Sequence, residues 1–465
     1  MSEPEAHFRR NNAVVNDAPG QALRLGSRAV INLWTLTSRF TVRHMNYRPH
    51  VVFLAPIRPA LAGLGLAIRM GMIAQALALR AKLTVVIVPV AGQAPASGRL
   101  PELLGARVVE MDLAGGVETP FALISVIDTD AERLAAFRAY GKPSLAASLG
   151  TRVRNEIRRL LADINPDVVV IGRAYLAGCA DLAPERARIV LDLDEDDEAS
   201  FASIARRLRQ ANPAAAAWAE EEGRACTRLV TRASKSVAMA FAASRYEAAS
   251  LRRRHPGLSV EVVENSLPMI PSRCPTPRKM NARPELLFVG ALAYPPNVEA
   301  VLWLAGAIMP RVRRHLPGAR LIVAGARPGS EILRLGMRPD IDVIPDPANL
   351  APLYARARLA VAPMRAGGGT RIKIIEAAGH GLPVVATREA LRGLDPPGGM
   401  VCVAPVVGSF ARACIDALSN PALPRLQAVA RRWASLKHDR RRHLSSTIFD
   451  TALSTDVLHQ QHRHG

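Results

Sequence analysis

Short, almost continuously apolar runs alternate along this chain with longer stretches of helical periodicity. Such runs occupy residues 51–55, 83–88, 167–172, 187–193, 236–242 and 260–264. Because they lack the polar alternation of a half-exposed strand, they are typical of a parallel sheet that is covered on both faces. Stretches such as AIRMGMIAQALALRA, which lie between them, have the periodicity of helices. We therefore predict a doubly wound, Rossmann-like α/β domain over residues 50–267.

The same alternation restarts after a proline-rich segment. Residues 268–284 contain five prolines and no hydrophobic period, which predicts an interdomain linker. Further strands are predicted at 285–290, 320–325, 341–345, 359–363, 383–387 and 401–405, with helices from about 297 to 315, from Ser330 and from about Thr370. These predict a second Rossmann-like domain over 285–430. A helical run and tail, 431–465, follow, and this long terminal helix is a candidate for crossing back to the first domain.

Charge and composition narrow the classes of partner. The formal net charge of +21 attracts polyanions, whether phosphorylated substrates, nucleic acid or an anionic lipid surface, although arginine-rich composition can also reflect a GC-rich genome. Aromatic residues make up only 4% of the chain, which disfavours a nucleic-acid binder that stacks bases. Residues 1–49 form a basic extension that contains RAVINLWTLTSRFTVRHM. This segment is interpreted as an amphipathic helix on a membrane surface, with a helix packed on the first domain or a disordered leader as the alternatives.

Cysteine usage and the apolar segments indicate a cytoplasmic protein. A peripheral position on the inner face of the membrane is compatible with this prediction. The five cysteines are scattered without a C-x-x-C pair, so we expect reduced packing residues and no metal site. The start of the chain lacks the apolar core of a signal peptide, and residues 59–92 are interrupted by charges too often to span a bilayer. The histidine-rich end is interpreted as a frayed tail.

The stretch PMRAGGGTRIKIIEAAGHGLPVVAT, residues 363–387, contains the main candidates for a ligand-binding site. It places three glycines between a predicted strand and a predicted helix, where an anion can approach the free N–H groups of the first turn. Arg371 and Lys373 add cations, and Glu376 lies far enough along the helix to accept hydrogen bonds from ribose hydroxyls. We therefore predict a nucleoside diphosphate here. The spacing fits neither a P-loop nor a dinucleotide fingerprint, and the alternative is an ordinary strand-to-helix turn with surface charges.

These residues resemble a known family. The segments FVGALAYPPN, LPGARLIVAGARP, DPANLAPLYARARLAVAPMRAGGGTRIKIIEAAGHGLPVVAT and RGLD, within residues 285–418, look like the donor-binding domain of the retaining glycosyltransferases of family 4. The glycine motif is similar to that of the GGGTR-type subgroup of group 1 glycosyltransferases. The first half matches more weakly, through residues 191–198, 244–256 and 260–266. The resemblance implies the GT-B fold, in which two Rossmann-like domains face each other across a cleft.

The resemblance also implies roles for individual residues. Glu376 stands where the family binds the ribose of the donor. Arg371, Lys373 and Glu376 are the expected catalytic residues, and the two cations stabilise the departing diphosphate without a metal ion. Donor binding is expected at Gly290, Asn297, Gly367, Gly368, Gly369, Thr370, Arg371, Lys373 and Glu376. The nucleotide-sugar is then a substrate, and no cofactor is expected. Gly63 and Gly65 correspond to the flexible glycine loop that faces donor and acceptor.

Three positions depart from the family pattern. Gly368 occupies the place of a second glutamate that many members have, and Ala291 with residues 294–296 replaces an Arg and Lys loop. Arg173 and Tyr175 lie where a histidine often follows a strand near the acceptor. We expect Arg173 to line the acceptor cleft.

The acidic run LDLDEDDE, residues 191–198, is the remaining candidate. It lacks the glycine of a calcium-binding loop, and D-x-D metal sites belong to a different transferase fold. Because the run follows a predicted strand, Asp192 and Asp194 are candidates for contacts with acceptor hydroxyls. The alternative is a solvated helix start.

Together these features predict a retaining glycosyltransferase. The enzyme is expected to move a hexose or similar sugar from a nucleoside diphosphate to a hydroxyl of a sugar or lipid-linked glycan, in cell-surface polysaccharide or glycolipid synthesis. Two rival interpretations stay open: a nucleotide-sugar epimerase with the same fold, and a non-catalytic protein that binds polyanions or nucleotide-sugars.

Overall fold

A seven-stranded parallel sheet organises the first half of the chain, in the order β3-β2-β1-β4-β5-β6-β7. All six strands predicted there are present, and an additional strand, Arg107–Glu110, pairs with Lys82–Ile87 at the edge. The strands are β1 His50–Ala55, β2 Lys82–Ile87, β3 Arg107–Glu110, β4 Val168–Gly172, β5 Arg188–Asp194, β6 Met239–Ala242 and β7 Val260–Val262.

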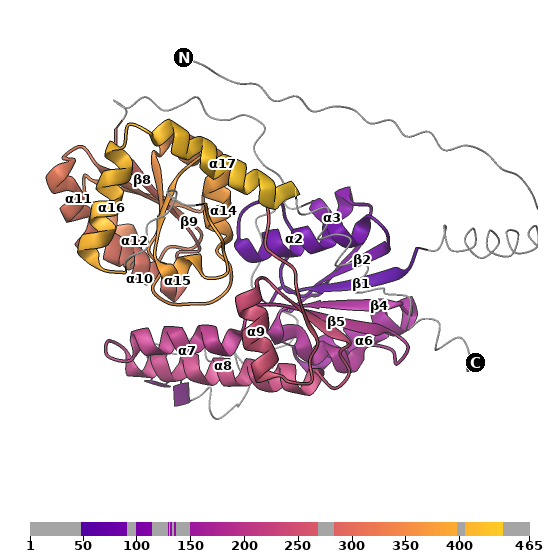
Figure 1. The fold of residues 1–465 in the computed structure, drawn as a ribbon. Coiled ribbons are helices and arrows are strands. Elements are labelled where there is room, and N and C mark those ends of the chain that lie inside the picture. The colour runs from indigo at the N-terminus through magenta and orange to yellow at the C-terminus, as the bar shows by residue number, and fades with distance from the viewer. Residues whose placement is uncertain are drawn as a thin grey trace, which may run out of the picture. The chain divides into compact units, whose positions relative to one another are not determined.

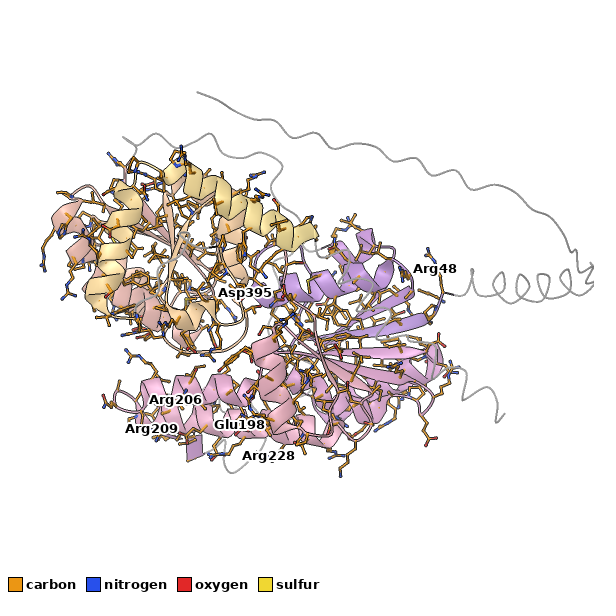
Figure 2. The ribbon with its side chains drawn as sticks, in the orientation of Figure 1. Arg48, Glu198, Arg206, Arg209, Arg228 and Asp395 are labelled. Carbon is orange, nitrogen blue, oxygen red and sulfur yellow. The ribbon has the colours of Figure 1, made fainter. Side chains whose placement is uncertain are left out.

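Helices cover both faces of this sheet, which is why its strands are apolar throughout. Alternate residues of β1 enter different cores: Val51 and Phe53 pack with α2 on one face, and Val52 and Leu54 pack with α6 on the other (Figure 1). The helical elements of this half are α2 Gly65–Ala78, α3 Leu100–Leu103, α6 Thr151–Ile164, the 3-10 segment η2 Ala174–Leu182, α7 Asp197–Leu208, α8 Pro213–Ala233 and α9 Arg245–Arg254.

A five-stranded parallel sheet, in the order β10-β9-β8-β11-β12, organises the second half. Its strands are β8 Glu285–Val289, β9 Arg320–Gly325, β10 Ile341–Pro345, β11 Leu359–Ala362 and β12 Val384–Ala386. The helix predicted from 297 to 315 is divided by a π-helical turn. The helical elements are α10 Pro295–Trp303, η3 Leu304–Ile308, α11 Met309–His315, α12 Ser330–Leu335, α13 Ala351–Arg356, α14 Ile372–Gly379, α15 Arg388–Leu391, α16 Val407–Ser419 and α17 Leu423–Asp439.

The computed structural model describes residues 48–90, 99–113, 129, 131–132, 134–135, 149–267, 283–397 and 405–439. From Pro49 onward they belong to one compact unit. The predicted amphipathic segment, most of the linker, the strand at 401–405 and the histidine-rich tail lie outside the described residues. Within these ranges, none of the helices has the length and apolar character needed to cross a bilayer.

Both sheets reverse their strand order beside the first strand of each half. In the first sheet β1 lies between β2 and β4, and in the second β8 lies between β9 and β11. Ligands of open parallel sheets bind outside the carboxyl ends of the strands at such reversals. The predicted α/β fold class is therefore confirmed, and it directs attention to the loops after β1, β4, β8 and β11.

The end of α17 contacts residues that follow the first sheet. The Lys437 ammonium donates to Glu264 Oε2 at 3.1 Å, and His438 Nδ1 lies 2.7 Å from the carbonyl oxygen of Leu267. Along its length α17 also packs against α14.

Candidate functional site

The glycine turn after β11 is held in a conformation that needs glycine. Gly367 and Gly369 have φ values of +93° and +70°, in the left-handed region that side chains disfavour. Helix α14 begins at Ile372, two residues later than expected, and Arg371 is its N-cap. The Arg371 guanidinium folds back onto the turn, where it donates to the carbonyl oxygens of Gly368 and Ala366. Its positive charge is thereby fixed at the turn.

Backbone donors of this turn already bind oxygen acceptors from the first half of the chain. The N–H of Gly367 donates to Ser203 Oγ at 2.7 Å, and the N–H of Gly369 donates to Glu247 Oε1 at 3.3 Å. Burial raises the pKa of Glu247 to about 7. Sequence reasoning missed both acceptors. Because an N–H group of this turn donates to a carboxylate, the turn can also bind an anionic ligand.

Three predicted donor residues come together beside the turn. The Lys373 ammonium donates to Asn297 Oδ1 at 2.8 Å and lies 4.5 Å from the centre of the Phe288 ring. A Cβ on Gly290 would come within 2.7 Å of Lys373 Nζ, so a larger residue there would displace the ammonium group. Burial, assisted by Arg371, lowers the pKa of Lys373 to about 7. An arriving phosphate would therefore restore the full charge of this lysine.

Glu376 is half-buried on α14, and its carboxylate is oriented by a tyrosine. The Tyr354 hydroxyl donates to Glu376 Oε2 at 3.0 Å, and the tyrosine ring stacks on His380 at 4.4 Å. Burial raises the pKa of Glu376 to about 7, against the opposing effects of Tyr354 and Lys373. Tyr354 and Lys373 also line a small pocket with Leu287. Tyr354 carried no signal in the sequence, because its role depends on the packing of α13 against α14.

The N-termini of α2 and α14 lie close together. Gly65 is the first residue of α2, and a Cβ placed on it would lie 3.8 Å from Ile372 Cδ1, at the first residue of α14. Gly63, two residues earlier, is exposed and has a φ of +98°. Thr370 Oγ1 accepts a hydrogen bond of 2.6 Å from Asn265. Gly65 thus lies beside the predicted donor site, and the positive ends of two helix dipoles come together there.

The residues predicted to meet the acceptor are mostly buried in ion pairs. Asp192 is fully buried against Arg69, at 2.5 Å, and Asp194 contacts both Arg69 and Arg173. Arg173 is 6% exposed and donates to Asp194, Glu195 and Asp197. Their acceptor role stays a prediction.

Arg173 and Asp194 also have strained backbones, with φ values of 69° and 65°. Strain of this kind persists where the surrounding structure fixes it, and it is common at functional sites. Among the described residues, no group of three or more His, Cys, Asp and Glu side chains is arranged to hold a metal ion.

Residues 283–420 match the family model described as "Glycosyl transferases group 1". The matched segment contains Gly290, Asn297, the glycine turn, Lys373 and Glu376. No curated protein sequence matches the chain.

Several solved structures have a fold similar to that of this chain. HepE of Anabaena, in complex with UDP and glucose, is similar over 87% of this chain and 99% of its own, with a TM-score of 0.57 and 15% identity. Sucrose-phosphate synthase from Thermosynechococcus elongatus is similar over 89% and 99%, with a TM-score of 0.55 and 12% identity. A glycosyltransferase from Rickettsia africae ESF-5 is similar over 86% and 99%, with a TM-score of 0.51 and 13% identity.

At these identities the structural similarity shows the fold, which is GT-B. Together with the match over residues 283–420, it confirms the predicted class of enzyme, a glycosyltransferase. The assignment to family 4 and to its GGGTR-type subgroup stays a prediction.

Proposed function

We propose that the protein is a retaining glycosyltransferase of family 4 that transfers a sugar from a nucleoside-diphosphate sugar to an acceptor hydroxyl. The observation that carries the proposal is the grouping of Arg371, Lys373 and Asn297 around the glycine turn, with Glu376 further along the same helix. Cations and helix N–H groups fit a diphosphate, and a partly buried carboxylate fits vicinal hydroxyls.

In the proposed reaction the diphosphate binds at the turn and the ribose binds at Glu376. Negative charge grows on the leaving phosphate as the glycosidic bond breaks, and Arg371 and Lys373 stabilise it. The acceptor attacks from the face that the phosphate leaves, so the anomeric configuration is retained. A diphosphate that uses the N–H groups of Gly367 and Gly369 replaces Ser203 and Glu247 as their partners. Neither a metal ion nor a cofactor is required in this scheme.

Similarity and charge support a choice of donor and acceptor classes. HepE was solved with UDP-glucose, which makes UDP-glucose the first donor to test. The net charge of +21 and the basic N-terminal extension support a lipid-linked glycan as acceptor, used in cell-surface polysaccharide or glycolipid synthesis by a cytoplasmic enzyme at the inner face of the membrane.

Replacement of Glu376 tests the donor site. Glu376→Ala removes hydrogen bonds to a charged acceptor that contribute about 1.5–3 kcal/mol, so the affinity for UDP-glucose should fall about 10- to 150-fold, as measured by calorimetry. Glu331→Ala, at an exposed glutamate of α12, is the matched control. Unchanged affinity and turnover in Glu376→Ala would refute the assignment of this site.

Two further assays of the wild-type protein separate the rival functions. Conversion of the donor sugar without any acceptor would identify an epimerase. Salt-sensitive binding of DNA that UDP-glucose leaves unaffected would instead identify a polyanion-binding protein.

A further inference from the structure

Glu195 lies beside the glycine turn, although it belongs to the loop between β5 and α7. A Cβ on Gly368 would overlap Glu195 Oε2, and a Cβ on Gly369 would lie 3.3 Å from the same oxygen. The carboxylate of Glu195 therefore fills the space that a side chain at position 368 would need. This explains, in terms of contacts, why the middle residue of the turn is glycine.

The Glu195 side chain is fixed in its orientation. Its Oε1 accepts a hydrogen bond of 2.8 Å from Arg173, and Arg173 is held in turn by Asp197 at 2.8 Å and by the carbonyl oxygen of Leu193 at 3.0 Å. The backbone before it is also constrained, since Asp194 has a φ of 65° and the pairing of β5 with β6 shifts register at this point. Only one carboxylate oxygen is thus engaged, and the other is directed at the turn.

Glu195 Oε2 is enclosed and has no hydrogen-bond partner in the described structure. The whole side chain is only 15% exposed. An enclosed carboxylate oxygen without a donor is costly, which favours a ligand that brings one. A phosphate oxygen is excluded as that ligand, because two negative charges would meet. A hydroxyl group supplies the missing donor without a charge.

The position of Glu195 relative to Glu376 indicates which hydroxyl it binds. The two carboxylates come from different directions: Glu376 is further along α14, whereas Glu195 contacts the turn before α14 begins. In a nucleoside-diphosphate sugar, hydroxyl-bearing rings flank the diphosphate on both sides. With the diphosphate at the turn and the ribose at Glu376, the ring that remains for Glu195 is the sugar to be transferred.

We propose that Glu195 accepts a hydrogen bond from a hydroxyl of the transferred sugar and so determines which donor sugar the enzyme uses. This inference rests on the function proposed above. Arg173 is then a positioning residue, because it acts through Glu195, and Gly368 is the position that leaves room for the carboxylate.

Glu195→Gln tests the proposal with little change in shape. The amide oxygen can keep the bond to Arg173, while the amide nitrogen replaces Oε2 and cannot accept. The probes are UDP, UDP-glucose and UDP-glucose analogues that each lack one hydroxyl of the glucose ring. We expect unchanged affinity for UDP, and a loss of about 10- to 100-fold in kcat/KM for UDP-glucose. One deoxy analogue should lose activity with the wild-type enzyme and lose no more with Glu195→Gln.

Glu185→Gln is the matched control, since it makes the same substitution at an exposed glutamate between η2 and β5. It should change neither thermal stability nor the ratio of UDP to UDP-glucose affinity. Equal losses of UDP and UDP-glucose affinity in Glu195→Gln would overturn the proposal, as would a change confined to the acceptor KM. A wild-type protein that binds neither UDP nor UDP-glucose would instead count against the proposed function.

Discussion

A buried ion pair between α2 and β5 supports the loops of the site, and its strength can be measured. Asp192 accepts from Arg69 Nε at 2.8 Å and from Nη2 at 2.5 Å, and both side chains are 0% exposed. Arg69 Nη1 donates to Asn265 Oδ1 at 2.8 Å and to the carbonyl oxygen of Val263 at 3.1 Å. The pair therefore joins α2, β5 and the residues after β7.

Asp192→Ala should destabilise the first domain strongly. Removal of one partner leaves a buried guanidinium without its carboxylate, which typically costs about 3–5 kcal/mol. Asp194 lies 3.4 Å from Arg69 Nε and retains part of the attraction, so we expect about 3 kcal/mol. For a domain of this size each kcal/mol lowers the melting temperature by about 2–4 °C, which gives a decrease of roughly 6–12 °C.

Urea unfolding followed by circular dichroism measures this loss. Asp163→Ala, at an exposed position of α6, is the control and should change stability by less than about 0.5 kcal/mol. The double variant Arg69→Met with Asp192→Leu removes both charges, so it should recover at least half of the lost stability. The reasoning would be refuted if the free energy of unfolding of Asp192→Ala lay within about 1 kcal/mol of the wild-type value. It would also be refuted if the double variant were no more stable than Asp192→Ala.

Two further predictions concern the donor side. Gly325→Ala places a Cβ on the carbonyl oxygen of Gly290, so it should cost about 1–3 kcal/mol of unfolding free energy and raise the KM for UDP-glucose, whereas Gly329→Ala, with open space around it, should do neither. The pKa of Glu247 is raised to about 7 from an ordinary value near 4.5, so its contribution to stability is complete below pH 4.5 and is lost as the pH rises through 7. Relative to the wild type, the free energy of unfolding of Glu247→Gln should therefore rise by up to roughly 3 kcal/mol between pH 4.5 and pH 8, as measured by urea unfolding. An equal difference between the two proteins at both pH values would contradict this.

The sheets were predictable because their strands are buried on both faces. Eleven predicted strands lie within the described residues, and each is present, with ends that differ by at most three residues. The exception is β3, which pattern reasoning missed. Arg107 and Glu110 are exposed at the edge of the sheet, so this strand has only two apolar residues and no continuous run. Strand prediction from apolar runs failed here because half of the residues of this short edge strand are exposed and charged.

The donor residues could be proposed from the sequence because their chemistry and their chain positions coincide. The glycine turn, Lys373 and Glu376 lie within ten residues of each other, on one strand-to-helix connection. Ser203 and Glu247 could not be found in this way. They reach the turn only because α7 and α9 pack near it, and contacts between residues more than a hundred positions apart leave no local signal.

The acidic run at the end of β5 shows why residue type alone does not assign a role. Asp192 points into the first domain and pairs with Arg69, Asp196 caps α7 through the N–H of Ala199, and Glu195 turns toward Gly368. Neighbouring carboxylates are separated by the register shift at 192–194 and by the left-handed conformation of Asp194. Because backbone geometry distributes the side chains, we expect the removal of one negative charge to have different consequences along the run: a weaker fold at residue 192, and a loss of donor-sugar recognition at residue 195.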